Sequence, residues 1–303
     1  MEVHRDFTEW AVSRGVKING IAAHKFPGRG LGIIAEKSFK ASLSSIVYIS
    51  VQEGDTILTV PISALRTLLT VPKSISIPIG AITVHGLLAA SLSLDTTLHY
   101  SAWRAVLPTA ESFKESVPLL WHTTLQALLP SAALSLLKNQ QAKISKDWSA
   151  VSSAFPSLSY ETYQYNWLLV NTRTFYFTSP LIKLSKPVNR DDCMALQPFA
   201  DYFNHADIAS AEALFSSQGY SIAASCSISK GDEIYISYGN HSNDFLLAEY
   251  GFSMESNKWD EADTGGRRVC RELCTVWEGR MLQDADCAEI VVLAQWSVAA
   301  IGK

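Results

Sequence analysis

The sequence lacks the basic excess of a nucleic-acid-binding protein. Its 25 lysine and arginine residues stand against 29 aspartate and glutamate residues, which leaves a formal charge of −4 over 303 residues. A protein that neutralises nucleic-acid phosphates needs a clear surplus of positive charge. Charged residues make up only 18% of the chain and hydrophobic residues 48%, so low-hydrophobicity disorder is excluded as well. The composition indicates a folded, soluble protein without nucleic acid as a partner.

Long hydrophobic runs are also missing. Residues 1–10 carry four charged side chains and no apolar core of a signal peptide. The longest stretch of low charge, 75–94, is broken by serine, proline, glycine and histidine, so no membrane span or membrane partner is expected. Five cysteines are an odd number without a secretory context, which favours reduced thiols. We expect a location in the cytoplasm, with the nucleus as the second choice.

The pattern of residue types changes twice along the chain. Short strands separated by glycine turns are expected in 18–61, helices in 63–177, and strands with tight turns again after Pro187. No internal repeat or low-complexity segment is present. The pattern predicts an α+β fold in which one β domain is split in sequence by a block of helices.

The last helix of the central block has a clear beginning. Ser159 is a suitable N-cap, and the helix that follows carries Tyr163, Trp167, Asn171 and Phe175 at intervals of four residues. Near the end of the chain, a second short helix over 244–250 is predicted after a serine–asparagine pair, and a glycine closes it.

Four segments could carry chemistry. In the first, 28–32, three glycines permit positive φ or close approach of the backbone to a ligand. A dinucleotide-binding loop would open a helix, whereas a β-prone run follows here, so a hairpin turn is favoured. The second segment, 171–175, contains Arg173. This arginine either is exposed or, if buried, needs an anionic partner, for which a ligand carboxylate is one candidate.

The third segment, 196–205, is an apolar run that ends in Asp201, Asn204 and His205. A turn stabilised by these side chains is the simple interpretation, and a ligand site is the other. The fourth is a strand over 233–238. Alternation places Tyr238 on its apolar face, where the hydroxyl needs a partner, and such a tyrosine is either a core residue or a catalytic one.

Taken in order, these segments resemble one family, the SET-domain protein methyltransferases. The resemblance is to the subgroup with a long helical insertion, which includes the plant Rubisco lysine methyltransferase, its animal relatives and fungal ribosomal-protein or elongation-factor methyltransferases. The residues that carry it are 28–32, 172–175, 198–205 and 231–239, extended by 242–243 and 246–252. Each segment alone is weak, but four in this order around such a helical block make chance agreement implausible.

The resemblance implies a SET β-fold of small sheets with a pseudoknot, interrupted by helices. It implies four parts: the N-terminal part of the SET domain in 1–62, the helical insertion in 63–193, the C-terminal part with the cofactor and catalytic motifs in 194–260, and a divergent or truncated tail in 261–303. The family's C-terminal substrate-binding lobe has no counterpart in the tail, which is about forty residues long. We therefore expect a truncation or a divergent gene model.

The resemblance also implies S-adenosylmethionine as the cofactor. The residues that match the family's cofactor contacts are Arg29, Gly30, Leu31, Arg173, Asn204, His205 and Tyr238. Tyr238 matches the catalytic tyrosine, and Asp201 and Tyr250 match positions that contact the protein substrate. Methyl transfer needs a neutral amine aligned with the methyl group in a site that excludes water.

The expected function is methyl transfer from S-adenosylmethionine to a lysine side chain of a non-histone protein of the ribosomal or elongation-factor type. Thr172 and Phe177 depart from the family pattern, so the substrate itself cannot be transferred. Protein-histidine methylation and a non-catalytic SET-like binding module remain the alternatives. No metal is expected, because the spacing of the tail cysteines Cys270, Cys274 and Cys287 favours unpaired thiols over zinc.

Overall fold

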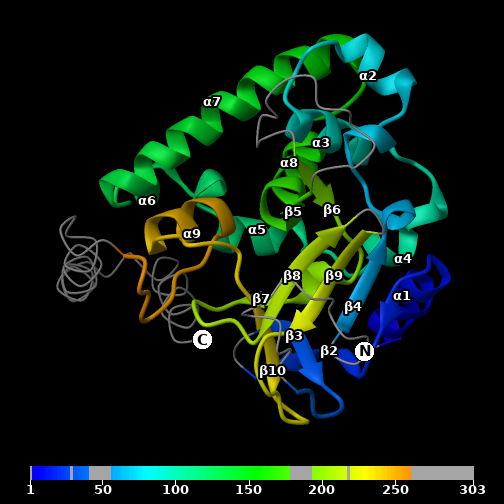
Figure 1. The fold of residues 1–303 in the computed structure, drawn as a ribbon. Helices are drawn as coiled ribbons and strands as arrows, with labels where there is room; N and C mark the ends of the chain where they lie inside the picture. Colours follow the sequence, from blue (N-terminus) through cyan, green and yellow to red (C-terminus); the bar gives the residue numbers. More distant parts are fainter. Residues whose placement is uncertain (1, 28–29, 41–55, 178–192, 217–218, 261–303) are drawn as a thin grey trace. The chain divides into compact units, whose positions relative to one another are not determined.

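The computed structural model describes residues 2–27, 30–40, 56–177, 193–216 and 219–260 (Figure 1). The chain divides into two compact units. The first comprises Met1–Leu107 and Lys146–Tyr238, and the second comprises Pro108–Ser145 and Gly239–Lys303. Helices and small sheets are both present, so the expected α+β class is confirmed. The expected division at residues 62, 193 and 260 stays a prediction.

The strands of the first unit form small sheets. One has the order β1-β4-β9-β8, the next β2-β3-β10-β7, and the last pairs β5 with β6. The bounds are β1 Lys17–Ile18, β2 Ile21–Phe26, β3 Gly30–Ala35, β4 Thr56–Pro61, β5 Thr174–Tyr176, β6 Met194–Leu196, β7 Asn204–His205, β8 Ala211–Ser216, β9 Gly219–Ala224 and β10 Glu233–Ile236.

The described part of the glycine-rich segment begins β3, the second strand of a hairpin. β2 and β3 pair antiparallel, with Phe26 opposite Gly30 and Ile21 opposite Ala35. A strand and not a helix follows the turn, which excludes the dinucleotide-binding interpretation. Gly28 and Arg29 lie outside the described residues, as does the strand expected at 46–51.

The helices of the first unit include α1 and most of the central block. They are α1 Glu2–Ser13, α2 Lys73–Ile79, α3 Val84–Leu94, α4 Ser101–Arg104 and α8 Tyr160–Arg173, with 3-10 turns η1 Ile62–Ala64, η2 Leu68–Thr70, η3 Leu98–Tyr100 and η6 Ala200–Tyr202. α3 is buried along most of its length and packs against α8, where the rings of His85 and Trp167 stack at 4.2 Å. The buried residues of α8 extend to Val170, and Arg173 at its C-terminal end is partly buried.

The capping pattern of α8 confirms the prediction made from the sequence. The Ser159 side chain accepts a hydrogen bond from the backbone N–H of Thr162. The predicted extent is partly wrong, because the helix ends at Arg173 and Phe175 lies in β5. The strand pairing of residues 174–176 with β6 replaces the helical hydrogen bonds there.

The second unit is helical. It contains α5 Ala110–Ser116, η4 Pro118–Leu120, α6 Thr123–Gln126, α9 Asn243–Tyr250 and the larger part of α7, which spans Ser131–Ala154. α9 begins after the N-cap Ser242 and ends at Gly251, whose φ of 80° is left-handed. Both boundaries agree with the sequence prediction. Of the helices in the described ranges, none combines the length and apolar character of a membrane span.

Candidate functional site

One sheet of the first unit brings three distant segments together (Figure 1). β7 runs parallel to β10, with Tyr235 opposite Asn204 and Ile236 opposite His205. β3 pairs with β10 in the antiparallel direction, with Glu233 opposite Ile34. The sheet therefore places the Asn-His pair on β7 one strand away from the glycine-rich strand β3, with β10 between them, although more than 160 residues separate the two in sequence.

The Asn204 amide is held by two acceptors. Its Nδ2 donates to the backbone oxygen of Leu31 at 3.0 Å and to Oε1 of Glu233 at 2.8 Å. A backbone carbonyl and a carboxylate only accept hydrogen bonds. The amide nitrogen must therefore face Leu31 and Glu233, and the amide oxygen must face the other way. The site thus presents a hydrogen-bond acceptor at this point.

Tyr238 and His205 are linked through the backbone. The backbone N–H of Tyr238 donates to Nδ1 of His205 at 3.0 Å, which places the proton of a neutral imidazole on Nε2. The Tyr238 hydroxyl donates to the carbonyl oxygen of Phe203 at 2.7 Å. The hydroxyl has the partner that its apolar position requires, and this bond fixes its oxygen beside the 203–205 segment.

The position of Tyr238 corrects one detail of the sequence analysis. The strand was expected to extend to residue 238, but β10 ends at Ile236. Ser237 is exposed and Tyr238 is partly buried. Because its N–H bonds to the His205 ring and not to a strand, Tyr238 faces the Asn-His pair and is not packed as an ordinary core tyrosine.

The glycines of β3 have different roles. At Gly32 an added Cβ would lie 2.5 Å from Oε1 of Glu233 and 2.8 Å from Nδ2 of Asn204. Those two side chains can therefore cross the strand only because residue 32 has no side chain. At Gly30 nothing lies within 4 Å of an added Cβ, but φ is +82°. Glycine is needed at residue 30 for its backbone conformation and at residue 32 for close approach.

Arg173 has an anionic partner within the protein. Its Nη1 donates to the backbone oxygen of Asp201 at 2.9 Å and lies 3.4 Å from Oδ2 of the same residue. The two side chains are 25% and 4% exposed. The sequence analysis considered a ligand carboxylate as the partner, and an internal carboxylate takes that role here. Arg173 Nε is buried and has no hydrogen-bond partner among the described residues, so the guanidinium keeps capacity for a further acceptor.

Asp201 is enclosed on several sides. The indole N–H of Trp103 points to its Oδ2 at 3.4 Å. Burial raises the pKa of the Asp201 carboxyl, although the Arg173 guanidinium opposes this change. The Asp201 side chain is 4% exposed and its carboxylate pairs with Arg173. The contact with a protein substrate that the resemblance implies for Asp201 stays a prediction.

A strained turn presents Asp201 to Arg173. Phe199 has φ 72° and ψ −34°, and among the described residues it is the one non-glycine position with positive φ. Its fully buried ring lies 6.2 Å from that of Phe7 and 5.3 Å from that of Tyr202. Packing of these rings offsets a conformational cost of about 1–3 kcal/mol. The chain then enters η6, which carries Asp201.

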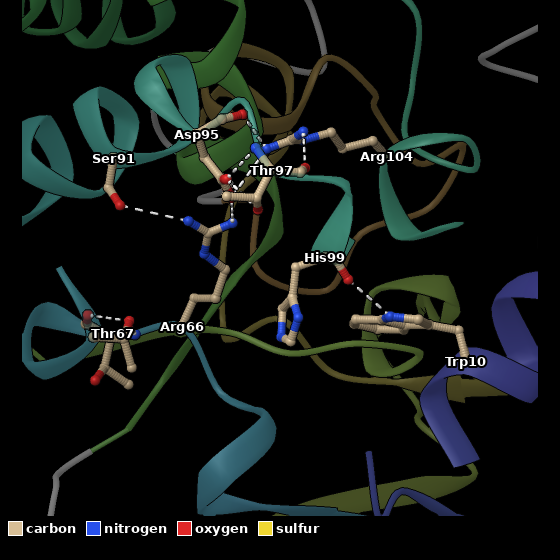
Figure 2. A network of polar contacts seen from close by, with 9 residues as sticks. Trp10, Arg66, Thr67, Ser91, Asp95, Thr97, His99 and Arg104 are labelled. Carbon is tan, nitrogen blue, oxygen red and sulfur yellow. Dashed lines mark hydrogen bonds and ion pairs between the residues drawn. The ribbon is translucent and has the colours of Figure 1, made fainter. Parts of the chain in front are cut away.

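A polar network supports the start of this segment (Figure 2). The guanidinium groups of Arg66 and Arg104 both point to Asp95, with N–O distances of 3.2 and 2.9 Å to Oδ2. Backbone bonds in both directions join Arg66 to Leu196, the last residue of β6. The Arg66 guanidinium also lies 4.3 Å from the Tyr100 ring centroid. The network thus ties the ends of α3 and α4 to the strand that precedes the Asn-His segment.

Tyr250 belongs to the second unit. It is the last residue of α9, and burial raises the pKa of its hydroxyl to about 12. Its ring lies 6.3 Å from that of Phe245 and 6.2 Å from that of Phe252. The contact with a protein substrate that the resemblance implies for Tyr250 stays a prediction.

The structure adds residues that the sequence analysis did not assign to the site. Glu233 accepts from Asn204 and from the Tyr235 hydroxyl, Trp103 contacts Asp201, and Phe203 provides the carbonyl for Tyr238. For Glu233 a signal was present, because strand alternation separates it and Tyr235 from the apolar face. In the described part of the chain, no group of three or more His, Cys, Asp or Glu side chains is placed to hold a metal. Cys270, Cys274 and Cys287 lie outside that part.

Comparison with known proteins yields relatives in sequence but no matching protein-family model. Ribosomal lysine N-methyltransferase set11 of Schizosaccharomyces pombe is 35% identical over 152 residues, which are 50% of this chain and 38% of that protein. SET domain-containing protein 4 of Mus musculus is 27% identical over 279 residues, which are 83% of this chain and 58% of that protein. The chain thus spans between about two fifths and three fifths of the length of these relatives.

Solved structures show the same architecture. The SET domain of LSMT bound to lysine and AdoHcy matches with a TM-score of 0.62 at 18% identity, covering 88% of this chain and 62% of that one. Rubisco LSMT bound to AdoMet matches with a TM-score of 0.59 at 18% identity, covering 83% of this chain and 56% of that one. At this level of identity the likeness establishes a shared fold.

Proposed function

We propose that this chain, which has the SET fold, transfers a methyl group from S-adenosylmethionine to a lysine side chain of a non-histone protein. The observation that carries the proposal is the joint placement of Asn204, His205 and Tyr238. Hydrogen bonds link Tyr238 to His205 and to the residue before Asn204, and link Asn204 to the glycine-rich strand. The relatives and structural neighbours named as lysine methyltransferases support the same reaction.

The residues present fit the amino-acid portion of the cofactor. That portion carries a carboxylate and an ammonium group, which need a donor and an acceptor respectively. The buried Nε of Arg173, without a partner among the described residues, is a donor of this kind. The outward oxygen of the Asn204 amide is an acceptor. Gly30 and Leu31 lie on the strand beside this amide, and Arg29, outside the described residues, completes the proposed cofactor contacts.

The cofactor supplies a methyl group on a positively charged sulfur. This chain must hold the substrate lysine as a neutral amine in line with that methyl group. A lysine amine is protonated at neutral pH, with a reference pKa of about 10.4. Transfer into an apolar site lowers that pKa and favours the neutral form. The Tyr238 hydroxyl already donates its proton to the Phe203 carbonyl, so its oxygen is oriented to accept from the amine. Tyr238 is the proposed catalytic residue, in that it aligns the amine.

The proposed substrate is a ribosomal protein or a translation factor, and the proposed location is the cytoplasm, with the nucleus second. The names of the fission-yeast relative and of a budding-yeast relative, Ribosomal lysine N-methyltransferase 2, support the ribosomal class. The net charge of the chain is only −4. We therefore expect the substrate protein to be recognised by shape complementarity at the contact surface and not by attraction of its net charge.

Methylation of proteins in a ribosome-containing extract with labelled S-adenosylmethionine tests the proposal. We expect a labelled band whose modified residue is lysine by mass spectrometry. Tyr238→Phe should reduce the rate about a hundredfold, because the amine loses its aligning oxygen. Tyr176→Phe is the matched control, since Tyr176 is 50% exposed on β5, and its activity should equal that of the wild type.

Different failures have different meanings. A folded wild-type protein that does not bind S-adenosylmethionine in calorimetry would contradict the proposal and favour the non-catalytic module. Label on histidine would replace lysine as the target. Full activity of Tyr238→Phe would remove Tyr238 from the catalytic role while leaving the reaction in place.

A further inference from the structure

The orientation of the Asn204 amide depends on Glu233. A primary amide presents nearly the same shape when its nitrogen and oxygen exchange places, so neighbouring groups decide which end faces the ligand. Here Nδ2 of Asn204 donates one hydrogen bond to the Leu31 carbonyl at 3.0 Å and another to Glu233 Oε1 at 2.8 Å. In the exchanged orientation the amide oxygen would face both acceptors, and this arrangement is repulsive. The charge of Glu233 makes the exchange more costly than the carbonyl alone would.

The Glu233 carboxylate is itself held in place. The Tyr235 hydroxyl donates to its Oε2 at 2.6 Å, two residues along the same strand. Backbone pairing of β10 with β3 and β7 fixes the strand on both edges. Gly32 leaves the space through which the carboxylate reaches Asn204, since an added Cβ would lie 2.5 Å from Oε1. Strand, tyrosine and glycine together therefore determine where the carboxylate lies.

A carboxylate behind the amide also polarises it. Donation of an N–H to an anion increases the negative charge on the amide oxygen at the opposite end. Among the donors of S-adenosylmethionine, the adenine amine and the ribose hydroxyls are neutral, whereas the α-ammonium group is a cation that only donates. An oxygen made more negative binds the cation preferentially.

We infer that Glu233, backed by Tyr235, is a positioning residue that fixes the Asn204 amide with its oxygen toward the α-ammonium group of the cofactor. This inference rests on the proposed function, because it takes S-adenosylmethionine as the ligand. Glu233 acts through Asn204 and is not expected to touch the cofactor.

The test compares two probes by calorimetry: S-adenosylhomocysteine and its desamino analogue, which lacks only the α-ammonium group. The wild type should bind S-adenosylhomocysteine about tenfold to a hundredfold more tightly than the analogue, as expected for one charge-assisted hydrogen bond. Glu233→Ala should remove most of this difference, weakening S-adenosylhomocysteine about tenfold and leaving the analogue within about twofold. A purely structural role would weaken both probes alike.

Two further variants sharpen the comparison. Glu233→Gln keeps a carbonyl oxygen toward Asn204 and should restore the preference for the ammonium-bearing probe to within about threefold of the wild type. Glu212→Ala removes an exposed carboxylate from β8 and should match the wild type with both probes. If Glu233→Ala does not fold, Tyr235→Phe replaces it, with a loss of about threefold confined to S-adenosylhomocysteine.

The outcomes separate the two levels of the argument. Suppose that the wild type binds S-adenosylhomocysteine and that Glu233→Ala loses affinity equally for both probes or not at all. That result overturns the inference and leaves the proposed function standing. A wild type that binds neither probe overturns the proposed function and this inference with it. In Tyr235→Phe, a loss that does not discriminate between the probes also overturns the inference.

Discussion

Asp95→Ala should destabilise the first unit strongly, because it leaves a buried cation without its partner. Arg66 and Asp95 lie 3.2 Å apart with side chains 9% and 11% exposed, and removing one partner of such a pair costs about 3–5 kcal/mol. Arg104, at 2.9 Å and 36% exposed, adds at most about 1 kcal/mol. We expect a loss of about 3–5 kcal/mol in the free energy of unfolding, measured by guanidinium chloride denaturation followed by tryptophan fluorescence.

The double variant Arg66→Met with Asp95→Ala distinguishes an uncompensated charge from lost packing. With the cation removed as well, the loss should shrink to about 1–2 kcal/mol, which is about 2–3 kcal/mol less than in Asp95→Ala. Arg104→Met alone is the comparison for a partly exposed partner and should cost about 1 kcal/mol or less. A double variant as unstable as Asp95→Ala would refute the reasoning, since burial of an unpaired guanidinium could not then be the cause.

The pH dependence of the same pair has a definite sign. Burial by itself raises the pKa of the Asp95 carboxyl, but hydrogen bonds from Thr97 and the attraction of Arg66 and Arg104 outweigh it and hold the pKa below 3.8. The stability that this carboxylate contributes is therefore present above about pH 3.8 and is lost as the pH falls through the folded-state pKa. The difference between wild type and Asp95→Asn should narrow on acidification and stay constant above about pH 5.

Four further changes test other parts of the molecule. Asp201 has the opposite sign, because burial raises its pKa above 3.8. Its contribution to stability is lost as the pH rises through the folded-state pKa, so the stability of the wild type minus that of Asp201→Asn should fall as the pH rises above about 3.8 in urea titrations. Gly32→Ala should weaken cofactor binding more than tenfold in calorimetry, because its Cβ would lie 2.8 Å from Asn204 Nδ2. Gly30→Ala, with open space but a φ of +82°, should cost about 1–2 kcal/mol of stability. Ser159→Ala removes the N-cap of α8 and should cost about 1 kcal/mol of unfolding free energy.

Each of these expectations can be contradicted. Parallel pH curves for wild type and Asp201→Asn would show that this carboxyl does not titrate differently on folding. Cofactor binding by Gly32→Ala that is as tight as that of the wild type would remove the argument from close approach. An unchanged free energy of unfolding in Ser159→Ala would mean that the N-cap hydrogen bond adds no stability to that from the packing of α8.

Local signals were sufficient where the structure itself is local. Ser159, which precedes side chains repeating every four residues, predicted the start of α8. Ser242 and Gly251 marked the two ends of α9. Each of these features depends on hydrogen bonds within four residues, which a short window of sequence contains. The order of strands, helices and strands followed from the same kind of local pattern.

The sequence analysis was wrong where partners come from elsewhere in the chain. It extended β10 to Tyr238, whereas the N–H of Tyr238 bonds to a histidine ring 33 residues away. It also gave no partner within the protein for Arg173, whereas Asp201 lies 28 residues further on and reaches it through a strained turn at Phe199. No periodicity within a helix or strand encodes such a pairing, because the fold alone brings the two residues together.

The pairing of β7 with β10 also bears on the order in which the site is assembled during folding. The bond from Asn204 to Glu233 closes a loop of 29 residues, and the bond from Asn204 to Leu31 closes one of 173. Loop-closure entropy makes the longer connection about 1.6 kcal/mol more costly. We therefore expect β7 and β10 to pair first and β3 to join them afterwards. Since Asn204 would meet Glu233 before Leu31, the amide would already be oriented when the glycine-rich strand docks.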